Sequence, residues 1–106
     1  MNRQQQIDSF LLAAHELAGE RLQLEPMRVE QAVNLLSKWR AKSGRTATDP
    51  LWDEWQVLLA KPTEQLIAAM TTRSDHADHL RSVSPMSALI TQSERSALLQ
   101  RSRQAA

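Results

Sequence analysis

The sequence predicts an all-α fold, a compact domain of five to six short helices. Composition gives the first indication, because the 106 residues include only two glycines and four prolines. The chain is rich in Ala, Leu, Gln, Glu and Arg, which lose little rotamer freedom in a helix. Strand-forming side chains are scarce, with no Tyr and one Phe. Apolar residues three and four positions apart along most of the chain are typical of amphipathic helices.

Length and charge indicate one globular domain, residues 1–106. Hydrophobic residues make up 42% and charged residues 24%, which argues against disorder. Without cysteine, neither a disulfide nor a thiolate metal site can form. No signal peptide or bilayer-spanning run is present, so we expect a cytoplasmic protein. A net charge of +1 gives no overall attraction to nucleic acid or anionic lipid.

The first predicted helix runs from Arg3 to Leu24. Its apolar side chains form one stripe: Ile7, Phe10, Leu11, Ala14, Leu17 and Ala18. Pro26 should end this helix, because the residue before a proline is pushed out of the α region. A chain of this size buries only a marginal core. Pairing of this helix with a second copy, in a dimer, is therefore an alternative to packing within the domain.

The second helix should start at Pro26, whose missing N–H costs nothing in a first turn. Residues 42–48 are predicted to be a loop, with Gly44 as the helix stop. Asp49 and Pro50 predict a third helix, with the Asp49 carboxylate as its N-cap. Its broad apolar face contains Leu51, Trp52, Trp55, Leu58 and Leu59.

The rest of the chain carries further start and stop signals. Pro62 should begin a fourth helix, and Ser74 should cap a fifth that ends near Ser82. A turn follows Ser84-Pro85. The pattern from Thr91 to Glu94 fits a capping box at the start of the last helix. Residues 103–106 are predicted to be a frayed tail.

Two histidines, His76 and His79, are three residues apart and could meet one metal ion from a single helix face. The sequence offers no third ligand at a recognisable spacing. We therefore favour a solvated helix start, where Asp75 and Asp78 suit the helix dipole. No metal and no cofactor are predicted.

The three tryptophans are candidates for a ligand or base-stacking platform. Trp52 and Trp55 fall within a helical apolar stripe, which favours a core role for both. Trp39 ends the apolar stripe of the second predicted helix, which follows Val29, Ala32, Val33 and Leu36, and lies beside Lys38 and Arg40. It is the better candidate for a partner surface, where tryptophan is enriched.

Several arginines lie late in the chain: Arg73, Arg81, Arg95, Arg101 and Arg103. Such residues neutralise phosphates, so contact with DNA is an open alternative. A solvated helix end is the simpler interpretation, because cations also suit a helix C-terminus. No recognition-helix pattern is present.

Catalytic motifs are missing from the sequence. There is no phosphate-binding glycine loop, nucleophile elbow or cysteine nucleophile. The adjacent carboxylates Asp53 and Glu54 point to different sides of a helix. We therefore predict that the protein is not an enzyme.

The segment from Leu51 to Leu99 carries a pattern of tryptophans, prolines and a late Glu-Arg pair. The pattern consists of Trp52, Trp55, Leu58 and Leu59, then Pro62, then Leu80, Arg81, Ser84 and Pro85, and finally Glu94 and Arg95. It resembles a group of small bacterial antitoxin-like proteins, some found beside nucleotidyltransferase-like toxins. The group usually has Phe-Ala-Gly after Ser-Pro, whereas this chain has Met86-Ser87-Ala88.

The resemblance implies a protein-binding inhibitor, an antitoxin that occludes a partner protein such as a cognate toxin. The candidate partner contacts are Trp39, Arg81, Met86, Arg95 and Arg101. For Arg81 a structural role is preferred, bonding free carbonyls at the end of the fifth helix or pairing with Glu94. Two alternatives stay open: a small dimeric DNA-binding transcriptional regulator, and an adaptor or anti-defence protein from a mobile element.

Overall fold

The computed structural model describes residues 2–104, and the all-α prediction is confirmed for them. This part of the chain contains six α-helices and two 3-10 turns, without a strand. In order they are α1 (Arg3–Leu24), η1 (Pro26–Arg28), α2 (Val29–Ser43), α3 (Asp49–Leu59), α4 (Thr63–Met70), α5 (Asp75–Ser82), η2 (Pro85–Leu89) and α6 (Gln92–Gln104). None of the described helices is long and apolar enough to cross a membrane.

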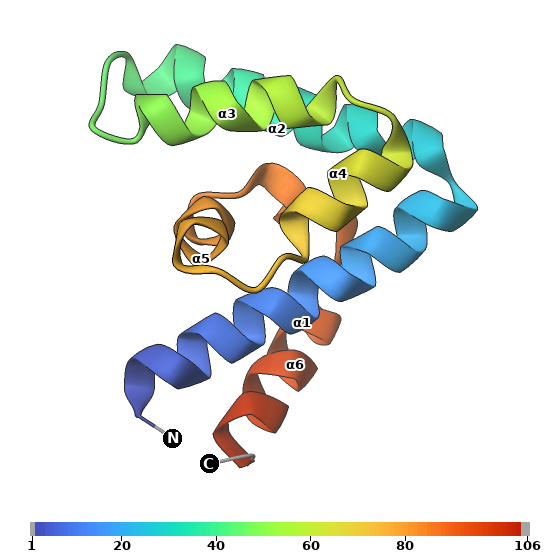
Figure 1. Cartoon of the computed structure of the whole chain (residues 1–106), viewed down its shortest axis with the longest axis vertical. Coiled ribbons are helices and arrows are strands. Elements are labelled where there is room, and N and C mark those ends of the chain that lie inside the picture. Colours follow the sequence, from blue (N-terminus) through green and yellow to red (C-terminus); the bar gives the residue numbers. More distant parts are fainter. Residues whose placement is uncertain (1, 105–106) are drawn as a thin grey trace.

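Helix α1 crosses the whole molecule, with α4, α5 and α6 packed against it (Figure 1). It begins with a capping box, in which the Asn2 side chain accepts the Gln5 N–H at 2.8 Å and the Gln5 side chain accepts the Asn2 N–H at 3.1 Å. Its buried side is made of Phe10, Ala14, His15, Ala18, Gly19 and Leu22. The chain's own helices thus cover Phe10, Ala14 and Ala18 of the predicted stripe, whereas Ile7 is exposed. A dimer through the covered part would have to displace these helices.

Helices α2 and α3 lie side by side and are joined at one end by a short loop (Figure 1). Arg40 of α2 bonds Asp53 at 2.6 Å and Gln56 at 2.7 Å on α3. The predicted loop 42–48 is wrong at its start, because α2 continues through Ser43, whose hydroxyl donates to the Trp39 carbonyl. The stop at Gly44 is confirmed by a φ of 65°, a value that favours glycine.

The two proline-marked starts differ in detail from their predictions. Pro26 begins the 3-10 turn η1, and α2 itself starts only at Val29. Asp49 is not the N-cap of α3 but its first residue, preceded by Thr48. Its carboxylate instead accepts the Thr46 hydroxyl at 3.2 Å. The hydrogen bond within this local turn takes the place of a capping bond from the carboxylate to the helix.

The core forms where α1, α2, α3, α4, α5 and η2 converge on Trp55, which is completely buried. Its indole N–H donates to the Leu80 carbonyl at 2.8 Å, and that of Trp52 donates to the Val83 carbonyl at 3.1 Å. Leu80 lies in the last turn of α5 and Val83 is the C-cap, where carbonyls lack the usual partner four residues on. The Leu80 carbonyl accepts the Val83 N–H as well, at 3.3 Å. The predicted inward position of both tryptophans is correct, although Trp52 is only half-buried.

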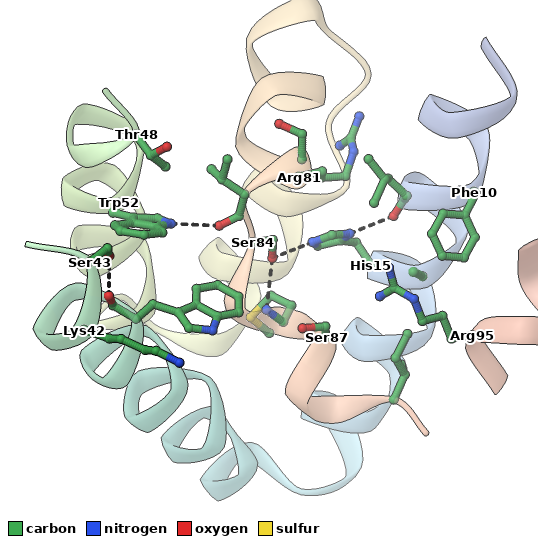
Figure 2. Close-up of a pocket in the computed structure, with 17 residues that line it drawn as sticks. Phe10, His15, Lys42, Ser43, Thr48, Trp52, Arg81, Ser84, Ser87 and Arg95 are labelled. Atoms are coloured by element: carbon green, nitrogen blue, oxygen red, sulfur yellow. Dashed lines mark hydrogen bonds between the residues drawn. The ribbon is translucent and has the colours of Figure 1, made fainter. Parts of the chain in front are cut away.

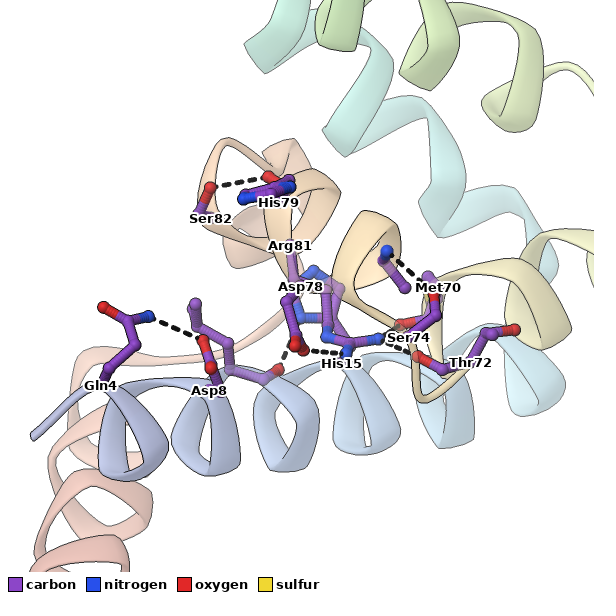
Figure 3. A network of polar contacts seen from close by, with 12 residues as sticks. Gln4, Asp8, His15, Met70, Thr72, Ser74, Asp78, His79, Arg81 and Ser82 are labelled. Atoms are coloured by element: carbon purple, nitrogen blue, oxygen red, sulfur yellow. Dashed lines mark hydrogen bonds and ion pairs between the residues drawn. The ribbon is translucent and has the colours of Figure 1, made fainter. Parts of the chain in front are cut away.

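Arg81 ties α5 to the end of α4 (Figure 3). Its guanidinium donates to the carbonyls of Met70 at 3.0 Å and Thr72 at 2.7 Å, and pairs with Asp78 at 2.7 Å. A structural role is therefore correct, but the predicted acceptors at the end of α5 and the predicted partner Glu94 are wrong. Helical side chains point toward the N-terminus of their own helix, which directs Arg81 back to the α4–α5 connection.

The start of α6 confirms the predicted capping box. The Thr91 hydroxyl accepts the Glu94 N–H at 3.1 Å, and the Glu94 carboxylate accepts the Thr91 N–H at 2.8 Å. The same carboxylate accepts two bonds from Arg21 of α1, whose hydrogen bonding lowers the pKa of Glu94 to about 2. The predicted frayed tail is wrong for Arg103 and Gln104, which are helical; residues 105–106 lie outside the described part.

A substitution at Gly19 would test how closely α1 packs against α4. A methyl group built on Gly19 would lie 3.2 Å from Ile67 Cγ2 and 3.4 Å from Met70 Cε. We expect Gly19→Leu to lower the free energy of unfolding by about 1–3 kcal/mol, because the added atoms overpack this contact. Urea denaturation would measure the loss. The control is Ala68→Leu on the exposed side of α4; an equal loss there would contradict the explanation.

Candidate functional site

A groove of about 610 Å³ opens on one side of the core (Figure 2). Seventeen residues line it, drawn from α1, the end of α2, the start of α3, the end of α5, η2 and the start of α6. Its volume is within the range of roughly 300–1,000 Å³ that ligand sites usually have. The groove is thus built by segments from residue 10 to residue 95.

Two tryptophans form one wall of the groove. Trp39 of α2 and Trp52 of α3 stack with ring centroids 6.1 Å apart and an interplanar angle of 28°. The bond from Trp52 to the Val83 carbonyl fixes the second ring. Both side chains are half-buried, so this wall still presents apolar surface to the groove.

The side facing α6 carries a stacked cation. The Arg95 guanidinium carbon lies 5.4 Å from the centroid of the Phe10 ring, a distance typical of cation–π contact. Figure 2 shows Arg95 beside Phe10 on the side of the groove away from Trp52 and Lys42. Stacking holds the guanidinium at the rim and leaves its N–H donors free for a ligand.

The floor contains a buried histidine that bonds at both ring nitrogens. His15 Nδ1 lies 2.7 Å from the Leu11 carbonyl oxygen, and Nε2 lies 2.7 Å from Ser84 Oγ. A carbonyl can only accept, so we assign the ring proton to Nδ1; Nε2 then accepts the Ser84 hydroxyl. The ring also stacks on Trp55, with centroids 6.0 Å apart. This arrangement connects the groove floor to the core.

Burial decides the charge of His15. The pKa of His15 falls from 6.5 to about 4, chiefly because its buried position disfavours the charged ring. The bond to the Leu11 carbonyl raises the pKa, and the nearby Arg81 charge lowers it. The ring is neutral at pH 7, as its bond from the Ser84 hydroxyl requires.

The Ser84–His15 pair resembles a nucleophile with its base, yet its surroundings favour a structural role. Ser84 Oγ already accepts the Met86 N–H at 3.0 Å, which caps η2. Ser84 is only 9% exposed. His15 is oriented by a backbone carbonyl, where a catalytic triad uses a carboxylate. The pair holds α1 against the α5–η2 connection.

The charges around the groove are all of one sign. Its lining includes three cations, Lys42, Arg81 and Arg95, and no Asp or Glu, although the whole chain has 12 acidic and 13 basic residues. Arg81 is buried and paired with Asp78. Lys42 and Arg95 are exposed and form no ion pair with residues 2–104. The rim therefore favours an anionic partner.

Four of the five predicted contact residues line this one groove: Trp39, Arg81, Met86 and Arg95. Arg81 and Met86 are 2% and 1% exposed, so they shape the floor and offer little surface. Arg101 is exposed on α6 and does not line the groove.

The sequence did not indicate His15, Ser84 or Trp52 as groove residues. The signal that could have indicated His15 is its position as a histidine in the middle of an apolar stripe. The histidine pair of α5 does not form a metal site among the described residues. There His76 Nε2 lies 2.7 Å from a Glu54 carboxylate oxygen instead.

Comparisons with protein-family models, curated proteins and solved structures found no match to this chain. The resemblance to small antitoxin-like proteins stays a prediction from the motif residues.

The lowered pKa of His15 predicts that the fold becomes less stable in acid. Its folded pKa of about 4 lies below its ordinary value of 6.5, so the neutral ring stabilises the fold above pH 6.5. This stabilisation is lost between pH 6.5 and about 4 and corresponds to roughly 3 kcal/mol. About 2 kcal/mol should disappear by pH 5.

The measurement is urea denaturation of the protein and of His15→Gln at pH 7 and pH 5. The His15→Gln variant should lose most of the pH dependence. His79→Gln, which removes an exposed histidine, should keep it. Equal pH dependence in the protein and in His15→Gln would show that another group is responsible.

Proposed function

We propose that this chain is a protein-binding inhibitor of the antitoxin type, which occludes a partner protein and performs no catalysis of its own. The observation that carries the proposal is the aromatic-walled groove, whose rim cations Lys42 and Arg95 form no ion pair with the described residues. Binding energy at protein interfaces concentrates in a few Trp, Tyr and Arg side chains near a central pocket. Trp39, Trp52 and Arg95 supply such side chains around one depression.

The way the groove is held also suits a binding surface. Trp52, His15 and Ser84 are each fixed by hydrogen bonds to other elements. A preformed surface loses little conformational entropy when a partner docks. The motif resemblance agrees with this use, since an antitoxin acts by covering its target. An adaptor or anti-defence protein would bind through the same contacts and differ only in its target.

A small DNA-binding regulator is the second candidate, and α6 is the reason to keep it. Its three arginines, Arg95, Arg101 and Arg103, are exposed and form no ion pair within residues 2–104. Phosphate contacts by such residues would give an affinity that falls steeply with salt.

The experiment is affinity capture with tagged full-length protein from the native host, at low and moderate salt, reading both protein and DNA. We expect one stoichiometric protein partner that survives moderate salt and whose activity falls when this chain is added. The variant Ser82→Trp fills the groove from an exposed lining position and should reduce capture at least about tenfold.

The matched control is Ser37→Trp, at an exposed position of α2 outside the groove, which should capture the partner normally. Enrichment of one DNA fragment that is lost as salt rises, with no protein partner, would favour the regulator. Equal capture by Ser82→Trp and Ser37→Trp would show that the partner does not bind in the groove.

A further inference from the structure

The groove combines apolar walls with a lining whose charged side chains are all cations. No carboxylate lines it, and two of its three cations are exposed and unpaired within residues 2–104. Other exposed cations of the described residues, such as Lys61 and Arg101, also form no ion pair. Lys42 and Arg95 differ from these because they line the groove, so they are available to a carboxylate that enters it.

The two cations stand at opposite sides of the groove. Figure 2 shows Lys42 below the tryptophan wall and Arg95 across the groove beside Phe10. One carboxylate cannot meet both at hydrogen-bonding distance, since the groove lies between them. A chain segment that crosses the groove can place one acidic side chain at each end. This separation favours a peptide segment over a small carboxylate ligand.

The apolar part of the groove lining favours an apolar group of the ligand. The groove is also lined by Trp39, Trp52, Phe10 and Ile90, which offer aromatic and aliphatic surface. A volume of about 610 Å³ exceeds what one side chain fills, so an aromatic anchor with a neighbouring aliphatic side chain would fit. Burying such a pair would remove its apolar surface from water, which is the main favourable contribution that could offset the costs of association.

From these observations we propose that the groove recognises an acidic amphipathic segment of its partner. An aromatic or large aliphatic anchor sits against the Trp39–Trp52 wall, and acidic side chains on either side of it pair with Lys42 and Arg95. Arg95, held on Phe10, takes its carboxylate through two parallel N–H donors. This inference rests on the proposed function, because it names the segment by which the partner would be held.

Selection from a displayed library of random 12-residue peptides on the immobilised full-length protein tests the proposal. We expect the enriched peptides to share a Trp, Phe or Leu anchor with Asp or Glu on both sides. Binding of a synthesised winner, followed by fluorescence polarisation, should weaken about tenfold in Lys42→Glu and in Arg95→Glu. The control Lys61→Glu, an exposed cation outside the groove, should bind normally.

Three results of the peptide experiments would overturn the proposal. They are enriched peptides without an acidic excess, binding that is equal in Lys42→Glu and Lys61→Glu, and a selection that enriches nothing. A solution dimer that Ser82→Trp abolishes would also overturn it, because a second copy would then be the occupant. If affinity capture finds a partner that ignores all groove variants, this inference fails while the inhibitor function stands. If acidic peptides bind but no partner is captured, the inhibitor function fails while the inference about the groove stands.

Discussion

The close approach of α4 to α1 is the constraint on which the other contacts depend. Ala18 and Gly19 keep this part of α1 narrow, and a single methyl group on Gly19 would already touch Ile67. With α4 held this near, its last carbonyl lies within reach of Arg81, which fixes α5. The end of α5 then provides the two carbonyls that orient the tryptophans of α3. Each step positions the next element, so a change at Gly19 should be felt far from α1.

The polar groups on the groove floor have hydrogen-bond partners within the protein. His15 and Ser84 bond each other and the backbone, so neither needs a bound water or ligand to satisfy it. Arg81 is the exception, since its buried Nε has no hydrogen-bond partner among the described residues. Its other donors are used to join α4 to α5, and the fold tolerates the unpaired nitrogen for that connection.

Local signals in the sequence were good guides to where helices begin and end. The bounds of α1 and the capping boxes depend on residues within a few positions of each other. The spacing of Thr91 and Glu94 alone was therefore enough to predict the capping box of α6. Predictions failed where a side chain had a choice of partners. The Asp49 carboxylate met Thr46 instead of capping α3, and Arg81 turned to α4 instead of Glu94. Spacing does not determine which of several nearby acceptors a long or flexible side chain will reach.

Helical periodicity, few glycines and scarce strand formers were enough to establish the all-α class, because these properties act within single turns. The groove needed the tertiary structure. Its lining includes Phe10, Trp39, Trp52, Ser84 and Arg95, which no local pattern connects. Whether a half-apolar helix face is covered or left open depends on the angles at which helices cross. Those angles are set by packing across the whole chain, so the gathering of four predicted contact residues around one depression emerged only in three dimensions.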